Sequence, residues 1–452
     1  MQANPTILTI AGSDSGGGAG IQADLKTIAM LGGFGASVIT ALTAQNTTAV
    51  TGIHPAPPEF VVQQYEAVTS DLTVRAAKTG MLFSAEIVRA IAEPLSRRSF
   101  PLVIDPVCVA QSGARLLEAA AVTEMVRSLF PQADLVTPNI PEAELLTGLS
   151  IKSAQDICEA AERILAMGPK AVLIKGGHMD SPASTDWYAT PGQKALPLMQ
   201  PRVDTRNLHG TGCTLSAAIA AHLGLGHDML ASVRKAQAYL HAALRASYSV
   251  GAGGGSPNHA VPLLKEQGRL GLLDELAEAG RALAQLPRFA RLIPEVRSNL
   301  VLALPYANDA KDVAGYSGRI TCTRRGEVIL AGGPEFGASS HMARVLLAAR
   351  RHNSNLSCAL NILCDEQTLS ALKRSGLTAA SFDRADEPAD GLGRGGGTMD
   401  WGTLSAIEAS NTPRNIDAVF DLGGPGKEPM IRLLARDPAE LLLKVRRILD
   451  ML

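Results

Sequence analysis

The chain has 452 residues, of which 46% are hydrophobic, 19% are charged and 4% are aromatic. This composition is typical of a globular protein with a full hydrophobic core, and it offers few aromatic platforms for single-stranded nucleic acid. Lys and Arg number 42 against 43 Asp and Glu, which gives a formal net charge of -1. Nucleic-acid and membrane-surface proteins normally carry a basic excess, so both classes of partner are disfavoured.

The cysteines and the apolar runs indicate the cellular compartment. Six cysteines are scattered along the chain, without a CxxC pair or the Cys/His spacing of a zinc site. The apolar run Thr6–Ala11 is too short for a signal peptide, and no stretch of 18 apolar residues is present. We therefore expect a cytoplasmic protein with reduced thiols and no membrane partner.

Short β-branched or apolar runs alternate with Ala- and Leu-rich stretches through the first half of the chain. The runs predict strands at Thr6–Ala11, Val38–Ala44, Leu102–Val107, Asp134–Thr137 and Ala171–Lys175. Helices are expected at Ala85–Arg97, Ala119–Phe130 and Ala154–Ala166. This alternation predicts βαβ units and a mainly parallel sheet with helices on both faces. Ligands of such sheets bind at the carboxyl ends of the strands, so residues that follow a strand are the first candidates for a site.

The composition changes most clearly at the Gly-rich segment Gly251–Asn258. Its glycines and Pro257 cannot continue the helix expected over Ala231–Tyr248, so the segment is either a linker or a loop inside one domain. A second α/β series follows, with elements expected at Leu272–Leu286 (helix), Leu300–Leu304, Ile320–Thr323 and Val328–Ala331 (strands).

The first expected strand leads into Gly12-Ser-Asp-Ser-Gly-Gly-Gly-Ala-Gly20. This stretch is not a P-loop, because Gly18-Ala19 stands where that motif requires Lys-Ser/Thr. It is not a dinucleotide-binding motif either, because no acidic residue follows a second strand about 20 residues further on. It is either a plain tight turn or a loop that brings backbone N–H groups close to a small ligand.

The turn His209-Gly-Thr-Gly-Cys213 opens an expected helix, Thr214–Leu223. Unpaired N–H groups at a helix start, exposed by two glycines, form an anion site at the favourable end of the helix dipole. A thiol in this position is pushed toward thiolate, and Cys213 is then a candidate base for a hydroxyl that attacks a γ-phosphate. The alternative is a glycine-capped helix with an inert cysteine.

Three charged residues are expected at the same edge of the sheet as this turn. Asp105 ends a strand, Glu142 opens a helix, and Lys175 ends a strand before two glycines. Two carboxylates suit a Mg²⁺ ion that binds nucleotide phosphates largely through water, and an ammonium neutralises transferring charge. Together they favour phosphoryl transfer from ATP.

Five segments, in order, resemble the hydroxymethylpyrimidine/phosphomethylpyrimidine kinases of the ribokinase superfamily. They are Ala11–Lys26, Ile39–Asn46, Lys78–Leu82, Thr137–Glu144 and the 209–213 turn, and the resemblance covers about residues 5 to 260. It implies two successive phosphorylations, of the hydroxymethyl group and then of the monophosphate. A pyridoxal kinase is the nearest competitor, and the Thr43–Gln45 segment argues against it.

The resemblance also implies roles for single residues. Gln45 would pair with the aminopyrimidine edge, since an amide both donates and accepts hydrogen bonds. The pocket would be lined by Gly12, Asp24, Met81 and Val107. Cys213 would be the base, and the backbone amides of Gly210, Thr211, Gly212 and Cys213 the anion hole.

The second half offers fewer chemical signals. Gly332–Ser340 leads into an expected helix with His341 in its first turn, which is either an anion site or a Ser-capped helix. A Gly-rich turn, Gly423–Glu428, carries Lys427 but lacks the P-loop pattern. Arg319 precedes an expected strand and by itself is an ordinary surface charge.

Six segments of this half resemble the thiamine-phosphate synthase domains of the ThiN type, over about residues 275 to 450. They are Ile293–Asn299, Asp312–Gly315, Ser317–Ile320, Phe336–His341, Ser381–Arg384 and Gly426–Pro429. The resemblance implies that pyrimidine diphosphate and thiazole phosphate are joined with release of pyrophosphate. Arg319 and His341 would be the essential pair, and Ser339 and Lys427 are candidates for phosphate binding. Similar domains also sense ligands without turnover, which is the competing interpretation.

We therefore predict an α/β protein with two domains. Residues 1–260 would form a ribokinase-like three-layer α/β/α kinase domain that uses ATP and Mg²⁺, residues 261–274 a linker, and residues 275–452 a smaller α/β synthase domain. The expected partners are small-molecule substrates and further copies of the chain, in a homo-oligomer. Neither nucleic acid nor a membrane is expected.

Overall fold

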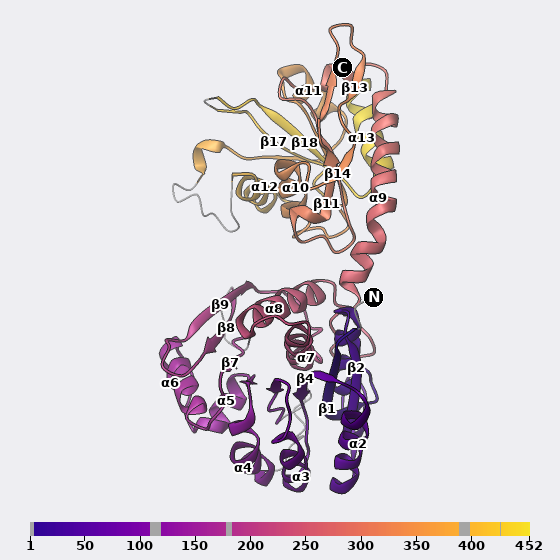
Figure 1. Ribbon diagram of the computed structural model, residues 1–452. Helices are drawn as coiled ribbons and strands as arrows, with labels where there is room; N and C mark the ends of the chain where they lie inside the picture. The colour runs from indigo at the N-terminus through magenta and orange to yellow at the C-terminus, as the bar shows by residue number, and fades with distance from the viewer. Residues whose placement is uncertain (1–3, 109–118, 178–182, 388–397, 425) are drawn as a thin grey trace. The chain divides into compact units, whose positions relative to one another are not determined.

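The computed structural model describes residues 4–108, 119–177, 183–387, 398–424 and 426–452 (Figure 1). The chain divides into two compact units, Met1–Pro262 and Leu263–Leu452. Among the described helices, none combines the length and the apolar character that a membrane crossing requires.

The first unit is built on a nine-stranded sheet in the order β3-β2-β1-β4-β5-β6-β7-β8-β9. Strands β2, β1, β4, β5, β6 and β7 run parallel, and β3, β8 and β9 are antiparallel additions at the two edges. The strands are β1 Thr6–Asp14, β2 Phe34–Gln45, β3 Val50–Pro55, β4 Val74–Thr79, β5 Leu102–Ile104, β6 Leu135–Val136, β7 Val172–Ile174, β8 Ala183–Ala189 and β9 Leu196–Pro201. The helices are α1 Gly20–Met30, α2 Pro58–Asp71, α3 Ala85–Leu95, α4 Ala119–Ser128, α5 Ile140–Thr147, α6 Ala154–Leu165, α7 Thr211–Gly224 and α8 Met229–Arg245.

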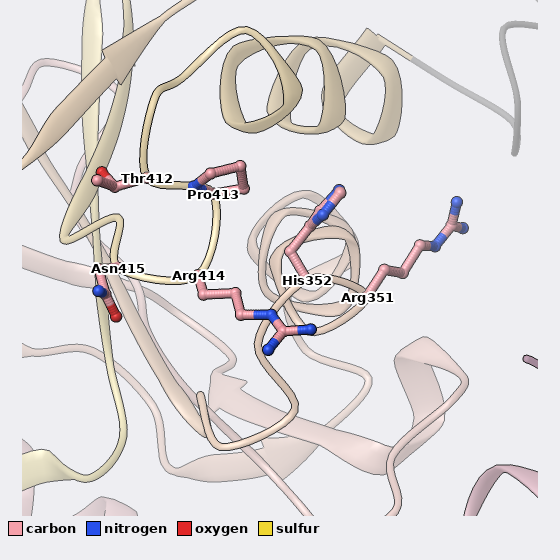
Figure 2. A pocket seen from close by; sticks show the side chains of 6 residues that line it. All are labelled: Arg351, His352, Thr412, Pro413, Arg414 and Asn415. Carbon is pink, nitrogen blue, oxygen red and sulfur yellow. The ribbon is translucent and has the colours of Figure 1, made fainter. Parts of the chain in front are cut away.

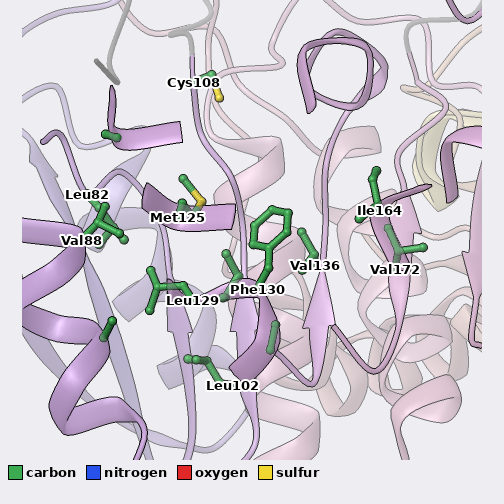
Figure 3. Packing of buried hydrophobic residues seen from close by; sticks show 14 of the residues in the cluster. Leu82, Val88, Leu102, Cys108, Met125, Leu129, Phe130, Val136, Ile164 and Val172 are labelled. Carbon is green, nitrogen blue, oxygen red and sulfur yellow. The ribbon is translucent and has the colours of Figure 1, made fainter. Parts of the chain in front are cut away.

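Alternate residues of each strand face opposite layers of helices. In β1, Leu8 and Ile10 join the core formed with α2, α3, α4 and α6, part of which Figure 3 shows around Phe130. Ile7, one residue away, joins the core formed with α1, α7 and α8 on the other face. Successive side chains of a strand point to opposite faces, so a strand with two apolar faces requires two helical layers. The predicted three-layer α/β/α architecture with a mainly parallel sheet is confirmed.

The central strand β5 is shorter than predicted and ends at Ile104. The N–H of Asp105 still donates to the Thr79 carbonyl at 3.0 Å, but Pro106 has no N–H to continue the ladder. Asp105 therefore lies at the carboxyl edge of the sheet.

The Gly-rich segment Gly251–Asn258 is a loop of the first unit. The N–H of Gly253 donates to Thr47 Oγ1 at 3.2 Å, and a side chain at Gly253 would lie 1.8 Å from the Thr47 carbonyl oxygen. Residues 261–274, expected as a linker, are instead the first part of the helix α9, Val261–Ala284. This stretch is helical because residues such as Leu272 bury their side chains in the core of the second unit.

The second unit has a seven-stranded sheet in the order β14-β11-β10-β15-β18-β17-β16, in which only β16 and β17 pair in parallel among the described strands. Its strands are β10 Leu300–Ala303, β11 Val313–Tyr316, β14 Pro334–Phe336, β15 Cys358–Leu363, β16 Ala379–Ser381, β17 Ala418–Asp421 and β18 Met430–Ala435, with a separate hairpin of β12 Ile320–Cys322 and β13 Val328–Leu330. Helices α9, α11 Glu366–Arg374 and α13 Pro438–Asp450 cover one face, and α10 Ser340–Ala349 and α12 Thr398–Glu408 cover the other. The predicted smaller α/β domain is confirmed.

Candidate active sites

The carboxyl edge of the first sheet brings together the three predicted charged residues. Lys175 Nζ lies 2.8 Å from Asp105 Oδ1 and 3.9 Å from Glu142 Oε2. Glu142 is fixed by a capping box, in which the Asn139 N–H donates to Glu142 Oε2 at 2.8 Å. The start of α7 is also close, since a side chain on Gly212 would lie 3.4 Å from Lys175 Nζ.

Burial and mutual charge set the protonation states in this cluster. Burial tends to raise the pKa of Asp105, but Lys175 and Lys78 hold that pKa below its ordinary value. Burial raises the pKa of Glu142 to about 7, and the charge of Asp105 contributes in the same direction. The pKa of Lys175 is raised because the two carboxylates outweigh its burial, so the amine stays charged.

The turn before α7 carries the backbone N–H groups predicted as an anion hole, of which that of Thr211 already donates to the Leu208 carbonyl at 3.2 Å. Gly210 adopts a left-handed φ of 82°, and a side chain there would lie 1.8 Å from the Gly18 carbonyl oxygen. The two Gly-rich loops therefore pack together in a way that requires glycine at position 210. In the described part of the chain, the N–H groups of Gly212 and Cys213 have no hydrogen-bond acceptor.

The protonation of Cys213 differs from the expectation. Desolvation raises the pKa of its thiol to about 11, although the nearby Lys78 ammonium acts in the opposite direction. The resting group is therefore a thiol at neutral pH, and the predicted push toward thiolate is wrong for the ligand-free protein. Desolvation outweighs the effect of the helix start because the charged form loses its water.

Three of the predicted pocket residues form one small apolar cluster. Met81 packs against Ala41, with Val107 beside them. A side chain at Gly12 would lie 2.3 Å from Met81 Cε, so glycine leaves the space that Met81 fills. Gln45, at the end of β2, accepts a hydrogen bond from Thr43 Oγ1 at 3.2 Å. It offers an amide at the same end of the sheet as this cluster.

Asp24 lies in the protein interior rather than in an exposed pocket wall. It is fully buried, with Lys78 Nζ 3.1 Å from its Oδ1 and 3.0 Å from its Oδ2, and Oδ2 also accepts a hydrogen bond from Thr9 Oγ1 at 2.6 Å. Both carboxylate oxygens are thus engaged by the protein. Lys78 is also fully buried, and no role was predicted for it from the sequence.

The sequence analysis also missed a link between the two Gly-rich loops. Asp14 Oδ2 lies 2.9 Å from His209 Nε2 and accepts the N–H groups of Gly18 and Ala19 at 3.0 and 2.8 Å. Gln45 Nε2 lies 3.4 Å from the same imidazole nitrogen. An Asp inside a Gly-rich loop commonly accepts nearby backbone N–H groups, which was the available signal.

In the second unit, the predicted residues Arg319 and His341 make separate contacts. Arg319 has a left-handed φ of 66°, rare for a residue with a side chain, and donates to the Val296 carbonyl at 2.6 Å. His341, in the first turn of α10, accepts a hydrogen bond from Arg432 Nε at 3.4 Å. No hydrogen bond joins Arg319 to His341 within the described residues.

The two phosphate-binding candidates are placed differently. Ser339 is the N-cap of α10, where its hydroxyl oxygen accepts the Met342 N–H at 3.4 Å. Lys427 is exposed on the Gly-rich turn, where its N–H donates to the Gly424 carbonyl at 2.9 Å. A separate hollow of about 420 Å³, lined by Arg351, His352 and residues 412–415, includes none of the predicted site residues (Figure 2).

Two family models match the chain. Residues 14–258, more than half of the chain, match the model described as phosphomethylpyrimidine kinase. The chain belongs to this family. Residues 275–447 match the model described as thiamine-phosphate synthase ThiN, so the second unit carries a domain of that type.

Named relatives cover the first unit. A thiamine biosynthesis bifunctional protein ThiED of Geobacter sulfurreducens is 50% identical over 56% of this chain and 52% of its own length, so the chain spans about half of that relative. A hydroxymethylpyrimidine/phosphomethylpyrimidine kinase of Haemophilus influenzae is 46% identical over 56% of this chain and 96% of its own. Among solved structures, an ADP complex of Bacillus subtilis pyridoxal kinase is 32% identical over 58% of this chain and 100% of its own, with a TM-score of 0.55.

Proposed function

We propose that the chain is a bifunctional enzyme of thiamine synthesis. Its first unit transfers the γ-phosphoryl group of ATP to 4-amino-5-hydroxymethyl-2-methylpyrimidine and then to the monophosphate. Its second unit joins the resulting diphosphate to thiazole phosphate and releases pyrophosphate. The proposal depends most on one observation, the unpaired N–H groups of Gly212 and Cys213 beside the Lys175 ammonium.

These groups suit a transferring phosphoryl group. In such a transition state negative charge is spread over the phosphoryl oxygens, and catalysis is mainly positioning and electrostatic stabilisation. The backbone N–H groups of Gly210, Gly212 and Cys213 would hold that charge, and Lys175 would neutralise it. Burial raises the pKa of the Cys213 thiol to about 11, so Cys213 would need a neighbouring positive charge to act as the base for the attacking hydroxyl.

The carboxylates fit the Mg²⁺ ion that a nucleotide carries. Asp105 and Glu142 are both buried, and Lys175 Nζ lies 2.8 Å from Asp105 Oδ1 but 3.9 Å from Glu142 Oε2. Burial raises the pKa of Glu142 to about 7, and a second cation nearby would stabilise the charged carboxylate. No cluster of three His, Cys, Asp or Glu side chains occurs in the described ranges, so phosphate and water would complete the coordination.

Two compounds are candidates for the substrate of the first unit, hydroxymethylpyrimidine and pyridoxal. Gln45 offers a donor and an acceptor to an aminopyrimidine edge, which favours the pyrimidine. Pyridoxal is the second candidate, because a Staphylococcus aureus pyridoxal kinase solved with an ATP analogue and pyridoxal is 33% identical, with a TM-score of 0.53. The same likeness supports ATP as the phosphoryl donor.

The second unit supplies groups for a diphosphate leaving group. We assign Arg319, His341 and Lys427 to this reaction, with Ser339 positioning the helix that carries His341. We place the kinase within residues 1–260 and the synthase within residues 275–452, and α9 connects the two. We also propose that the chain forms a homo-oligomer and that it works in the cytoplasm, where ATP is present. Binding of a thiamine precursor without turnover is the alternative for this unit.

The test is to incubate the purified chain with hydroxymethylpyrimidine, ATP, Mg²⁺ and thiazole phosphate and to follow each product by chromatography. We expect the monophosphate, the diphosphate and then thiamine phosphate. Pyrimidine diphosphate that accumulates without thiamine phosphate would leave a kinase and refute the synthase. A parallel assay with pyridoxal should give a much lower kcat/KM, and the reverse order would refute the pyrimidine assignment.

A further inference from the structure

Three charged side chains meet at one end of the second sheet. Asp421 ends β17, Arg432 lies in the neighbouring β18, and Arg384 follows the neighbouring β16. Asp421 accepts Arg384 Nε at 2.6 Å and Arg384 Nη2 at 3.2 Å through its two oxygens. Its Oδ2 also lies 2.8 Å from Arg432 Nη1. One carboxylate thus fixes the orientation of two guanidinium groups.

Arg432 is buried with part of its guanidinium unused. The side chain is fully buried. Its Nε donates to His341 Nε2 at 3.4 Å and its Nη1 to the Met430 carbonyl at 3.3 Å. Its Nη2 has no hydrogen-bond partner in the ranges that the structure describes, and the guanidinium carbon lies 5.8 Å from the centre of the Phe382 ring. A buried donor without an acceptor is costly, so this nitrogen points to a ligand with an oxygen to offer.

The neighbourhood has excess positive charge. Two guanidinium groups face the single carboxylate of Asp421, and His341 beside them is neutral. Desolvation lowers the pKa of His341 to about 4, and the cations Arg432, Arg384 and Arg344 act in the same direction. Burial raises the pKa of Asp400, and the charges of Arg351 and Arg344 act in the opposite direction. A neutral imidazole that accepts from Arg432 through Nε2 carries its proton on Nδ1, which is a further donor.

The Gly-rich turn borders this cluster. The N–H of Gly423 donates to Asp421 Oδ1 at 3.0 Å. Gly423 has a left-handed φ of 81°, and a side chain there would lie 2.6 Å from the Lys427 carbonyl oxygen. A side chain at Gly424 would be in van der Waals contact with Arg384, at 3.8 Å from its Cδ, so the turn lies directly beside that arginine.

We infer that Arg384 and Arg432, held in place by Asp421, bind the diphosphate group of the second unit's pyrimidine substrate and of its pyrophosphate product. The inference rests on the proposed condensation. Arg384 uses Nε and Nη2 and Arg432 uses Nε and Nη1 within the protein, so Arg384 Nη1 and Arg432 Nη2 would contact the phosphate oxygens. Two cations match a diphosphate better than a single phosphate. Negative charge grows on the leaving diphosphate as its bond to the pyrimidine carbon breaks, and fixed cations stabilise that charge.

The test uses the full chain with Arg384→Gln, since Arg384 is partly accessible and Arg432 keeps Asp421 paired. Arg414→Gln, in the separate hollow of Figure 2, is the matched loss of one positive charge in the same unit. With isolated pyrimidine diphosphate and thiazole phosphate, we expect Arg384→Gln to raise the KM for the diphosphate at least tenfold. It should weaken product inhibition by pyrophosphate to the same extent. The KM for thiazole phosphate, the kinase rate and all constants of Arg414→Gln should stay unchanged.

A second measurement does not need turnover. Pyrophosphate should slow hydrogen exchange in peptides that contain residues 381–387 and 418–435 of the wild type and of Arg414→Gln, and not of Arg384→Gln. Arg432→Lys, which keeps the charge, should lose most of this protection if it folds. A raised KM for thiazole phosphate alone, or protection that survives Arg384→Gln, would overturn the inference. Protection in a wild type that makes no thiamine phosphate would refute the proposed condensation and support the anion site.

Discussion

Glu142→Gln should stabilise the first unit in a pH-dependent way. The wild-type carboxyl is buried, and its pKa rises from 4.5 to about 7. At about 1.4 kcal/mol for each tenfold change, keeping Glu142 charged above pH 7 costs about 3 kcal/mol. Gln is isosteric, and its amide oxygen still accepts the Asn139 N–H, so the cap of α5 is retained.

The sign follows from proton binding. Between pH 4.5 and about 7 the folded wild type holds a proton on Glu142 that the unfolded chain has lost, so its stability falls as pH rises through this window. The advantage of Glu142→Gln should therefore be near zero at pH 4.5 and reach about 3 kcal/mol at pH 8.

Urea unfolding at pH 5 and pH 8 measures this difference. The chain has two tryptophans, and a Trp401→Phe background leaves Trp187 of β8 to report on the first unit. Glu144→Gln, two residues along α5, is the matched control and should change stability little at either pH. An equal effect of Glu142→Gln at both pH values would show that the charge of Glu142 is not costly. The proposed need for a second cation would then lose its support.

Three further substitutions test particular contacts. Gly210→Ala should reduce the kinase rate at least about 100-fold, because the new methyl group would overlap the Gly18 carbonyl oxygen. Gly226 also has a left-handed φ, but a methyl group there would contact nothing, so Gly226→Ala should keep the rate. Lys78→Met should destabilise the first unit by about 3–5 kcal/mol, and Lys78→Met with Asp24→Asn should recover much of this, as measured by urea unfolding. Arg319→Ala should abolish thiamine phosphate formation and leave the kinase rate unchanged, and a parallel kinase loss would show that the two units are coupled.

The arrangement of the first site follows from strand order, which the sequence contains. The site spans 70 residues of sequence, from Asp105 to Lys175, with Glu142 between them. Each of the three follows a strand of one parallel sheet, so all three reach the same edge. Hydrophobic alternation was therefore sufficient to predict their proximity. Their catalytic roles stay predictions.

The parts that the sequence did not predict depend on burial and long-range pairing. Desolvation decides the pKa of Cys213, and local sequence does not report it. Asp14 and His209 are 195 residues apart, and their contact arises from two loops whose conformations have no periodic signal. Arg432 reads as one polar residue in an apolar strand, and only the pairing of β17 with β18 brings it to Asp421.

The pH dependence of kcat/KM distinguishes the two candidate titrating groups of the kinase, because this ratio reports the free enzyme. Burial puts the pKa of Cys213 at about 11 and that of Glu142 at about 7. A rise in kcat/KM with pH near 7 at limiting Mg²⁺ should therefore reflect loss of the Glu142 proton. That rise should persist at a lower rate in Cys213→Ser and disappear in Glu142→Gln. If it disappears instead in Cys213→Ser, the free enzyme already holds a thiolate, and the helix start outweighs desolvation at that sulfur.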